Sequence, residues 1–357
     1  MKARLLFVST PISPIGAGDG GGVETTLKQI TPILAAKGYQ VTVLAPTGSR
    51  LPPGALICEI NGTPPPNATT SVKDSAVIIT ADGVLEGMWQ QAAQMQDRFD
   101  VIISMSYDWL SYYLTPFLSI PVLHWVTIGS CLRVVDTAIA AQYQITPTRF
   151  AFYSKAQAST FSFVDLHRTR ILPGAVDLDR FHFQPKPGEI LLWVARISPE
   201  KGLEAAVKAA DGVGVQLHVC GKIQDETYWE NVNRLCKPGQ IIYHGLLPHH
   251  RLQELLGRAL AMLVTPTWVE AFGMTVVEAL ACGTPVIAYD RGAPKEIIED
   301  GKSGFLVPQD DIASLISAIK RIPSLARANA RNRAEHYGVD KLVERVEAWI
   351  ADVLRSG

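Results

Sequence analysis

The chain has 357 residues, which is too long for one small core and fits two α/β domains. Hydrophobic residues make up 47% of the chain and charged residues 19%, so each half can bury a substantial apolar core. The formal net charge of -1 argues against a dedicated binder of nucleic acid or of anionic membranes.

The five cysteines are odd in number and scattered, and none forms a CxxC pair. This pattern is typical of reduced thiols in a cytoplasmic protein and predicts no metal site. No apolar stretch approaches the ~18 residues needed to span a bilayer. The run Met1–Val8 is not followed by a small-residue cleavage site, so it predicts a first strand rather than a signal peptide. We expect a cytoplasmic protein without membrane insertion, of undetermined oligomeric state.

Short runs rich in β-branched residues alternate with helical segments along the whole chain, the pattern of parallel-sheet α/β domains. In the first half, a glycine-rich loop at Gly16–Gly22 follows the first strand, and Pro32 is expected to kink or shorten the next helix. The region Leu51–Thr70 is rich in proline and glycine and predicts an irregular loop. The predicted elements of this half are strands Arg4–Ser9, Gln40–Ala45, Val101–Ser104 and Pro121–Val126, and helices Val23–Lys37, Trp109–Leu118 and Leu132–Gln142.

A second alternation begins after Phe181–Gly188, whose two prolines and glycine indicate an interdomain linker. We therefore place one domain at residues 1–180 and the other at residues 181–339. Ligands of such sheets bind at the carboxyl ends of the strands, so we expect a site in a cleft between the domains. The predicted elements are strands Ile190–Ala195, Gln216–Cys220, Ile241–Tyr243, Leu260–Thr265 and Pro285–Ala288, and helices Gly202–Ala210, Arg251–Ala259 and Met274–Ala281.

Two groups of arginines stand out, and we interpret both as solvated surface of helices and loops. They are Arg168 and Arg170, and then Arg327, Arg331 and Arg333.

Two cations border the expected site. Arg196 lies at the carboxyl end of a predicted strand, and Lys201 begins the next helix, just before Gly202. Two cations beside a helix N-terminus suit a diphosphate, because charge neutralisation and free backbone N–H groups act together. Many ordinary surface turns carry a Lys or Arg, so the pair by itself does not establish a site.

Two carboxylates lie further along the chain. Glu270 precedes a glycine turn, and Glu278 lies just over one turn into the helix that follows. This spacing lets the helix N-terminus point its amides at an anion or a sugar, with one carboxylate on each side. The neighbours of Glu278 are apolar, so its helix is expected to be buried, where an unpaired charge is costly. This favours a functional role for Glu278 over a solvated one.

These segments resemble family 4 of the retaining glycosyltransferases. Ala195–Gly202 resembles the family's GRxxxEKG turn, and Glu270–Glu278 resembles its E-x7-E signature. The resemblance covers essentially the whole chain and is strongest from Pro173 to Val307. Further motifs follow in the family's order at Gly20–Glu24, Pro173–Phe181, Ala281–Ala288 and Gly304–Val307.

The resemblance implies a GT-B fold, in which two Rossmann-like domains face each other across a cleft. The first domain would bind the acceptor and the second the nucleotide-sugar donor, with the last helix, about 340–357, packing back on the first. No metal or other cofactor is implied, because Arg196 and Lys201 would neutralise the donor diphosphate. Glu278 would bind the ribose hydroxyls of the donor, and Glu270 would hold its hexose.

Backbone groups complete the donor site that the resemblance implies. Gly21 and Gly22 would let the first loop approach the donor, since a Cβ there would obstruct it. The helix amides that would hold the hexose and its phosphate belong to Phe272, Gly273, Met274 and Thr275.

Family members retain the anomeric configuration of the donor sugar. The resemblance therefore implies a front-face reaction in which the leaving diphosphate accepts the proton of the acceptor. Arg196, Lys201 and the helix amides would stabilise the departing diphosphate, and no carboxylate nucleophile is required. Many relatives place a histidine where this chain has Thr127. His124 lies three residues earlier, and a shift of three along a strand reverses the face. His124 therefore remains either a substrate contact or a core histidine.

The first domain supplies the candidates for acceptor binding. Tyr107, Asp108 and Trp109 are candidates to contact a flat acceptor, although ordinary core packing is the better explanation of any one of the aromatic residues. Together with Phe7–Pro11 they resemble cyanobacterial UDP-glucose:tetrahydrobiopterin glucosyltransferases, which implies glucose transfer from UDP-glucose to a small pterin acceptor. Two alternatives remain open: a transferase of lipid-linked or surface polysaccharide synthesis, and a nucleotide-sugar-binding protein without transfer activity.

Overall fold

The computed structural model describes residues 2–17, 21–66, 68 and 71–356, so Gly20 and part of the predicted glycine-rich loop lie outside it. The chain divides into two compact units. The first comprises Met1–Gly174 together with Val339–Gly357, and the second comprises Ala175–Gly338.

The first unit is an α/β domain. Its strands are β1 (Arg4–Val8), β2 (Gln40–Pro46), β3 (Ala55–Ile60), β4 (Val101–Ser104), β5 (Val122–Val126), β6 (Phe150–Phe152) and β7 (Arg170–Ile171). Its helices are α1 (Gly22–Ala36), α2 (Val84–Met95), α3 (Trp109–Leu114), α4 (Arg133–Ile145), α5 (Lys155–Ala158) and α13 (Val339–Ser356). In the described part of the chain, the strands form one parallel sheet of order β3-β2-β1-β4-β5-β6-β7. Consecutive residues of β1 from Leu5 to Val8 are all buried, as expected for a parallel sheet covered on both faces.

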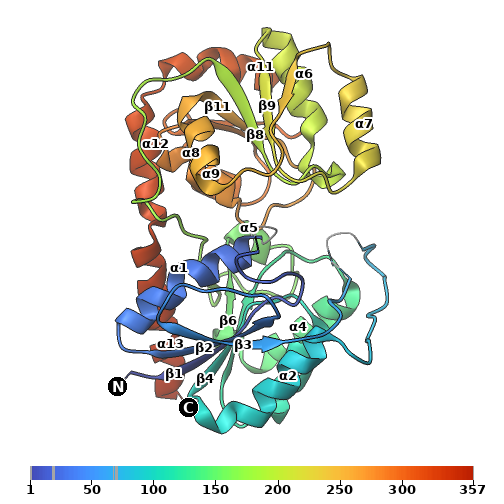
Figure 1. Cartoon of the computed structure of the whole chain (residues 1–357), viewed down its shortest axis with the longest axis vertical. Helices are drawn as coiled ribbons and strands as arrows, with labels where there is room; N and C mark the ends of the chain where they lie inside the picture. Colours follow the sequence, from blue (N-terminus) through green and yellow to red (C-terminus); the bar gives the residue numbers. More distant parts are fainter. Residues whose placement is uncertain (1, 18–20, 67, 69–70, 357) are drawn as a thin grey trace. The chain divides into compact units, whose positions relative to one another are not determined.

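The C-terminal helix α13 returns to the first unit, where Figure 1 also marks both chain ends. The helix packs against α1, and Glu347 accepts hydrogen bonds from Lys2 and Lys37 at 2.7 and 2.8 Å. The buried indole of Trp349 donates to the carbonyl of Thr148 at 3.0 Å. The last helix therefore belongs to the core of the first unit although it follows the second in sequence.

The second unit is also an α/β domain. Its strands are β8 (Ile190–Val194), β9 (Leu217–Cys220), β10 (Ile241–Tyr243), β11 (Ala259–Val264), β12 (Val286–Tyr289) and β13 (Gly304–Val307). Its helices are α6 (Leu203–Val213), α7 (Glu226–Arg234), α8 (His249–Arg258), α9 (Met274–Ala281), α10 (Pro294–Ile297), α11 (Ile312–Arg321) and α12 (Arg327–Ala334). The strands form a parallel sheet of order β10-β9-β8-β11-β12-β13. This order reverses direction between β8 and β11, which makes their carboxyl ends the topological switch point of a Rossmann-like fold.

The prediction of two successive Rossmann-like domains is confirmed. The boundary lies at 174/175 rather than at 180/181, because the intervening segment is bound to the second unit. The amide of Val176 donates to Tyr337 O at 2.8 Å, and Arg331 donates to Phe181 O at 2.8 Å. The expected linker from Phe181 onward is therefore part of the second unit.

Two local expectations in the first unit are wrong. The region expected to be an irregular loop contains β3, an edge strand paired with β2, whose half-exposed residues give no buried run to detect. The expected shortening of the helix at Pro32 does not occur, and α1 continues to Ala36, because Leu27, Ile30 and Leu34 are buried and this packing outweighs the cost of the proline.

The arginines of α12 are not solvated surface, which corrects that interpretation. The Arg327 guanidinium is buried and donates to three backbone carbonyls and to Thr284 Oγ1, at 2.7 to 2.9 Å. Arg331 and Arg333 likewise donate to backbone carbonyls of the second unit. In the first unit, Arg170 bridges to Asp352 of α13 at 2.7 Å. These cations stabilise the fold rather than presenting a basic patch.

Within the described residues, none of the helices combines the length and the apolar character required to cross a membrane.

Candidate active site

The switch point of the second sheet brings together three of the predicted donor-site residues, Arg196, Lys201 and Glu270. The chain leaves β8 toward α6 and carries Arg196 and Lys201 in that turn. It leaves β11 toward α9 and carries Glu270 in that loop. Because β8 and β11 are adjacent parallel strands, both connections emerge at the same edge of the sheet.

Lys201 and Glu270 form the central ion pair of this site. Lys201 Nζ lies 2.6 Å from Glu270 Oε2, and the two side chains are only 13% and 17% exposed. The indole of Trp268 also donates to Glu270 Oε2, at 3.1 Å. Burial raises the pKa of Glu270, but the charge and hydrogen bond of Lys201, the hydrogen bond of Trp268 and the charge of Arg196 together outweigh it and hold that pKa below its ordinary value.

Gly202 brings the Lys201 turn against the end of β11. Its φ of 64° lies in the left-handed region, and a Cβ there would collide with the carbonyl oxygen of Thr265. The Thr265 hydroxyl donates to Gly202 O at 2.7 Å, and the amide of Thr267 donates to Glu200 O at 2.9 Å. The two connections are therefore fixed to each other through their backbones.

The backbone of Glu270 is fixed from its other side by the turn after β12. Gly292 has a φ of 69° and packs directly on the Glu270 backbone, and the amide of Ala293 donates to Glu270 O at 2.9 Å. Arg291 donates to Pro266 O at 2.7 Å. The loop that carries Glu270 is thus held at both ends.

Arg196 is the more exposed cation of the site. Its side chain is 38% exposed and contacts Glu200 Oε1 at 3.4 Å, while another guanidinium nitrogen donates to Gln224. Glu200 also accepts from the Ser198 hydroxyl at 2.7 Å. These partners hold the guanidinium beside the turn and leave part of it open to solvent.

The N-terminus of α9 supplies further groups. Gly273 caps the helix with a φ of 90°, and Met274 and Thr275 occupy its first turn, where backbone N–H groups lack intrahelical partners. Phe272 is buried against Tyr337, with ring centroids 5.7 Å apart. Its side chain therefore anchors the turn.

Glu278 lies one turn further along α9. Its carboxylate is half-buried and has no hydrogen-bond partner among the residues that the structure describes. Burial raises the pKa of Glu278 to about 7, against the opposing charge of Arg180. A carboxylate with unused acceptors in a half-buried position can accept hydrogen bonds from hydroxyl groups of a ligand.

In the first unit, Gly21 and Gly22 begin α1 after β1. The Gly21 amide donates to Glu24 Oε2 at 2.7 Å, and Glu24 Oε1 accepts from Ser13 at 2.8 Å. Gly21 has an ordinary φ of -92°, and a Cβ there would meet only normal contacts. The conformation of the loop therefore does not itself require glycine at residue 21.

Two of the acceptor candidates have structural partners. The Tyr107 hydroxyl accepts from the amides of Cys131 and Leu132 at 2.9 and 2.8 Å and donates to Asp136 at 2.8 Å. Asp108 caps α3 by accepting from the Ser111 amide at 2.8 Å. Both side chains are used in holding the ends of helices.

His124 is a core residue, the second of its two predicted interpretations. The ring is fully buried, with ring centroids 4.6 Å from Tyr112 and 5.0 Å from Phe150. Its Nε2 contacts Thr115 Oγ1 at 2.9 Å, and burial lowers its pKa to about 3. Thr127 by contrast is half-exposed just past the end of β5. A buried neutral imidazole is separated from any ligand at the strand ends.

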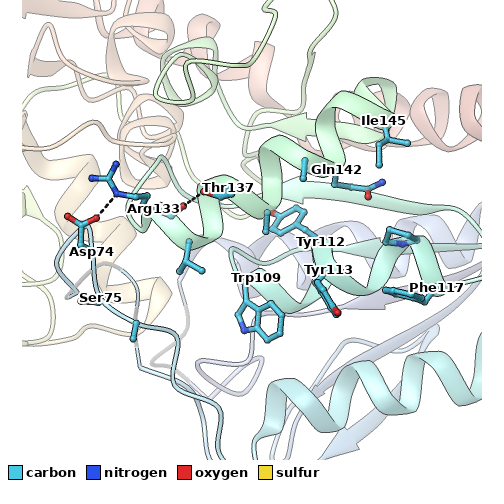
Figure 2. Close-up of a pocket in the computed structure, with 15 residues that line it drawn as sticks. Asp74, Ser75, Trp109, Tyr112, Tyr113, Phe117, Arg133, Thr137, Gln142 and Ile145 are labelled. Carbon is cyan, nitrogen blue, oxygen red and sulfur yellow. Dashed lines mark hydrogen bonds and ion pairs between the residues drawn. The ribbon is translucent and has the colours of Figure 1, made fainter.

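Trp109 lines an apolar cavity of about 730 Å³ that the sequence analysis did not predict. Figure 2 shows Trp109, Tyr113 and Phe117 in a row along α3 and the turn after it, opposite α4, with an Asp74–Arg133 ion pair at one end. Tyr113 and Phe117 are 58% and 71% exposed. The spacing of four residues between these aromatics was the available sequence signal.

Within the described ranges, no cluster of three or more His, Cys, Asp or Glu side chains is arranged to hold a metal ion.

Residues 177–340 match the model of a family described as Glycosyl transferases group 1. The D-inositol 3-phosphate glycosyltransferase of Mycolicibacterium smegmatis is 25% identical, over 99% of this chain and 91% of the relative. The enzyme of that name from Geodermatophilus obscurus is also 25% identical, over 97% of this chain and 88% of the relative.

Solved structures of glycosyltransferases share the fold. Sucrose-phosphate synthase from Thermosynechococcus elongatus has a TM-score of 0.81 at 19% identity and covers 100% of both chains. Anabaena HepE in complex with UDP and glucose has a TM-score of 0.77 at 16% identity, over 98% of this chain and 100% of the other. Residues 177–340, which make up almost all of the second unit, therefore match the group 1 glycosyl transferases, and the chain as a whole has the GT-B fold.

Proposed function

We propose that this protein is a retaining, metal-independent hexosyltransferase that uses a nucleotide-sugar donor, with UDP-glucose as its substrate. The observation that carries the proposal is the grouping of Arg196, Lys201 and Glu270 with the N-terminus of α9 at one switch point. This arrangement offers cations and amides for a diphosphate and a carboxylate for a sugar.

Each donor group has one role in the proposal. Arg196 and Lys201 neutralise the diphosphate and stabilise its departure, as a metal ion does in other transferases. Glu278 accepts hydrogen bonds from the ribose hydroxyls, since its carboxylate has no partner among the described residues. Glu270 and the amides of residues 272–275 bind the hexose and its phosphate.

The proposed front-face reaction explains why the anomeric configuration of the donor sugar is retained. The leaving diphosphate oxygen accepts the proton of the acceptor hydroxyl, so the donor site needs no carboxylate nucleophile. The anomeric proton of the product, followed by NMR during turnover, distinguishes retention from inversion. Unchanged turnover in excess EDTA tests the metal independence.

The acceptor is proposed to be a small hydroxyl compound bound by the first unit in the cytoplasm, with tetrahydrobiopterin as the first candidate. The relatives' names give inositol phosphate as a second small acceptor to test. A lipid-linked acceptor is favoured by one specific observation, the apolar cavity between α3 and α4. The cation that lines the cavity, Arg133, is paired with Asp74, and Lys73, next to Asp74 in sequence, is paired with Asp136. Among the described residues, the cavity therefore lacks the unpaired basic side chains that membrane docking would add.

The test is a screen of purified enzyme with UDP-glucose and GDP-mannose against tetrahydrobiopterin, inositol phosphate and lipid-linked acceptors. In the active combination, Arg196→Ala is expected to lower kcat about 10²- to 10³-fold while the protein stays folded, since it removes one stabiliser of the leaving group. Near-normal turnover in that variant contradicts the assigned role.

Donor hydrolysis without acceptor separates an enzyme from a nucleotide-sugar-binding protein. Wild type is expected to release UDP slowly, and Glu270→Ala to release much less. If neither releases UDP and no acceptor supports turnover, the enzyme assignment fails.

A further inference from the structure

Trp268 is an aromatic residue inside the donor site to which the sequence motifs assign no role. It lies in the loop between β11 and α9, two residues before Glu270. Its indole N–H donates to Glu270 Oε2 at 3.1 Å, and the Lys201 ammonium lies 4.7 Å from the centroid of its ring. One side chain therefore contacts both members of the central ion pair.

The two contacts of Trp268 use different properties of the indole. The ring face carries negative potential and attracts the Lys201 ammonium. The N–H is a donor that does not ionise, so its bond to the Glu270 carboxylate does not depend on where Lys201 points. Glu270 Oε2 thus has two donors, one mobile and charged, the other fixed and neutral.

A bound diphosphate changes the partners of Lys201. An ammonium group forms its strongest hydrogen bonds with anionic oxygens, and a diphosphate offers more charge than one carboxylate. Glu270 then shares or loses the cation that neutralises it, at a half-buried position where an unpaired charge is costly. The Trp268 N–H is the donor that remains.

We propose that Trp268 is a positioning residue of the donor site, which holds the Glu270 carboxylate toward the donor hexose while Lys201 moves its hydrogen bond to the diphosphate. This inference rests on the proposed donor role of the site. It assigns Trp268 to recognition of the sugar rather than of the nucleotide.

The backbone conformation of the loop between β11 and α9 does not depend on the Trp268 side chain. Backbone bonds hold it on both sides, from Thr267 N to Glu200 O and from Ala293 N to Glu270 O, each at 2.9 Å. Arg291 adds a bond to Pro266 O at 2.7 Å. Trp268→Phe is therefore expected to keep the loop and a smaller aromatic face and to remove the N–H.

The experiment compares wild type with Trp268→Phe and Trp268→Leu. It measures the affinity for UDP by calorimetry, and kcat/KM for UDP-glucose across pH. The control is Trp229→Phe, the same substitution on α7, where the indole packs on Tyr243 with centroids 4.9 Å apart. The control is expected to match wild type in both measurements.

Trp268→Phe is expected to lower kcat/KM between about 10- and 100-fold, the range for a hydrogen bond to a charged group. The affinity for UDP should change less than about threefold, because UDP lacks the hexose. The acidic limb of the pH profile should move to higher pH, since Glu270 loses a donor that favours its ionised form. Trp268→Leu should lower kcat/KM further, because it also frees Lys201.

The outcomes separate the inference from the proposed function. If wild type binds UDP and transfers glucose but Trp268→Phe keeps its kcat/KM and pH profile, the inference is overturned and the proposed function stands. An equal loss of UDP affinity and kcat/KM assigns Trp268 a purely structural role and also overturns the inference. If wild type neither binds UDP nor uses UDP-glucose, the proposed donor fails and the inference fails with it.

Discussion

Glu278 provides a test of whether a residue proposed to bind the donor lowers the stability of the ligand-free protein. The perturbation is Glu278→Gln, which keeps the shape of the side chain and removes its charge. The carboxylate is half-buried on α9 and lacks a hydrogen-bond partner among the described residues. Glutamine should therefore make the ligand-free protein more stable at high pH, although it impairs donor binding.

The magnitude and sign follow from the pKa. Burial raises the pKa of Glu278 from an ordinary 4.5 to about 7, and each pKa unit corresponds to about 1.4 kcal/mol. The folded state thus favours the protonated form of Glu278. The stability that this preference contributes is fully present below pH ~4.5. It is lost as pH rises through about 7. Above that pH the wild type carries a penalty of up to about 3 kcal/mol that the glutamine variant lacks.

The assay is urea unfolding of both proteins at pH 4.5, 7 and 9, without nucleotide. The free energy of unfolding should be nearly equal at the lowest pH and should favour Glu278→Gln by about 1–3 kcal/mol at the highest. The control is Glu230→Gln, whose side chain is 67% exposed and which should show no such dependence. Equal stabilities of wild type and Glu278→Gln at pH 9 would refute the predicted free-energy cost of the ionised Glu278 side chain at this position. Calorimetry with UDP should show weaker binding by the Glu278→Gln variant.

Two further predictions concern the scaffold. Gly202→Ala should destabilise the protein more than Gly214→Ala, although both glycines have positive φ, 64° and 67°. Left-handed backbone costs alanine roughly 1–2 kcal/mol at either position, but only at residue 202 does a Cβ also collide with Thr265 O; equal losses of Tm would contradict that close approach. Arg327→Met should lower the free energy of unfolding by about 2–4 kcal/mol, because four acceptors lose their donor. Denaturant titration checks this against the exposed control Arg168→Met, and similar stabilities of the two variants would be evidence against it.

The amino-acid sequence by itself determined the alternation of strands and helices in each half. Buried runs such as Leu5–Val8 and Leu191–Trp193 carry the apolar signal of parallel strands within a few residues. The motif residues before α6 and α9 were predicted from charged side chains beside the turns at Gly202 and Gly273 and from their resemblance to the family motifs, and both glycines do have positive φ. Helix α2 was missed, although its buried residues Val84, Met88 and Ala92 follow a helical spacing.

Only the tertiary structure decided which of these residues meet. Strand order places β8 beside β11, and this brings Lys201 to Glu270 across 69 positions of sequence. No local pattern encodes that contact, because it depends on how non-consecutive strands pair. The same reason explains Trp268, whose role arises from a partner on another connection. It also explains the core position of His124, because the rings of Tyr112 on α3 and Phe150 on β6 enclose it only once the sheet and its covering helix have formed.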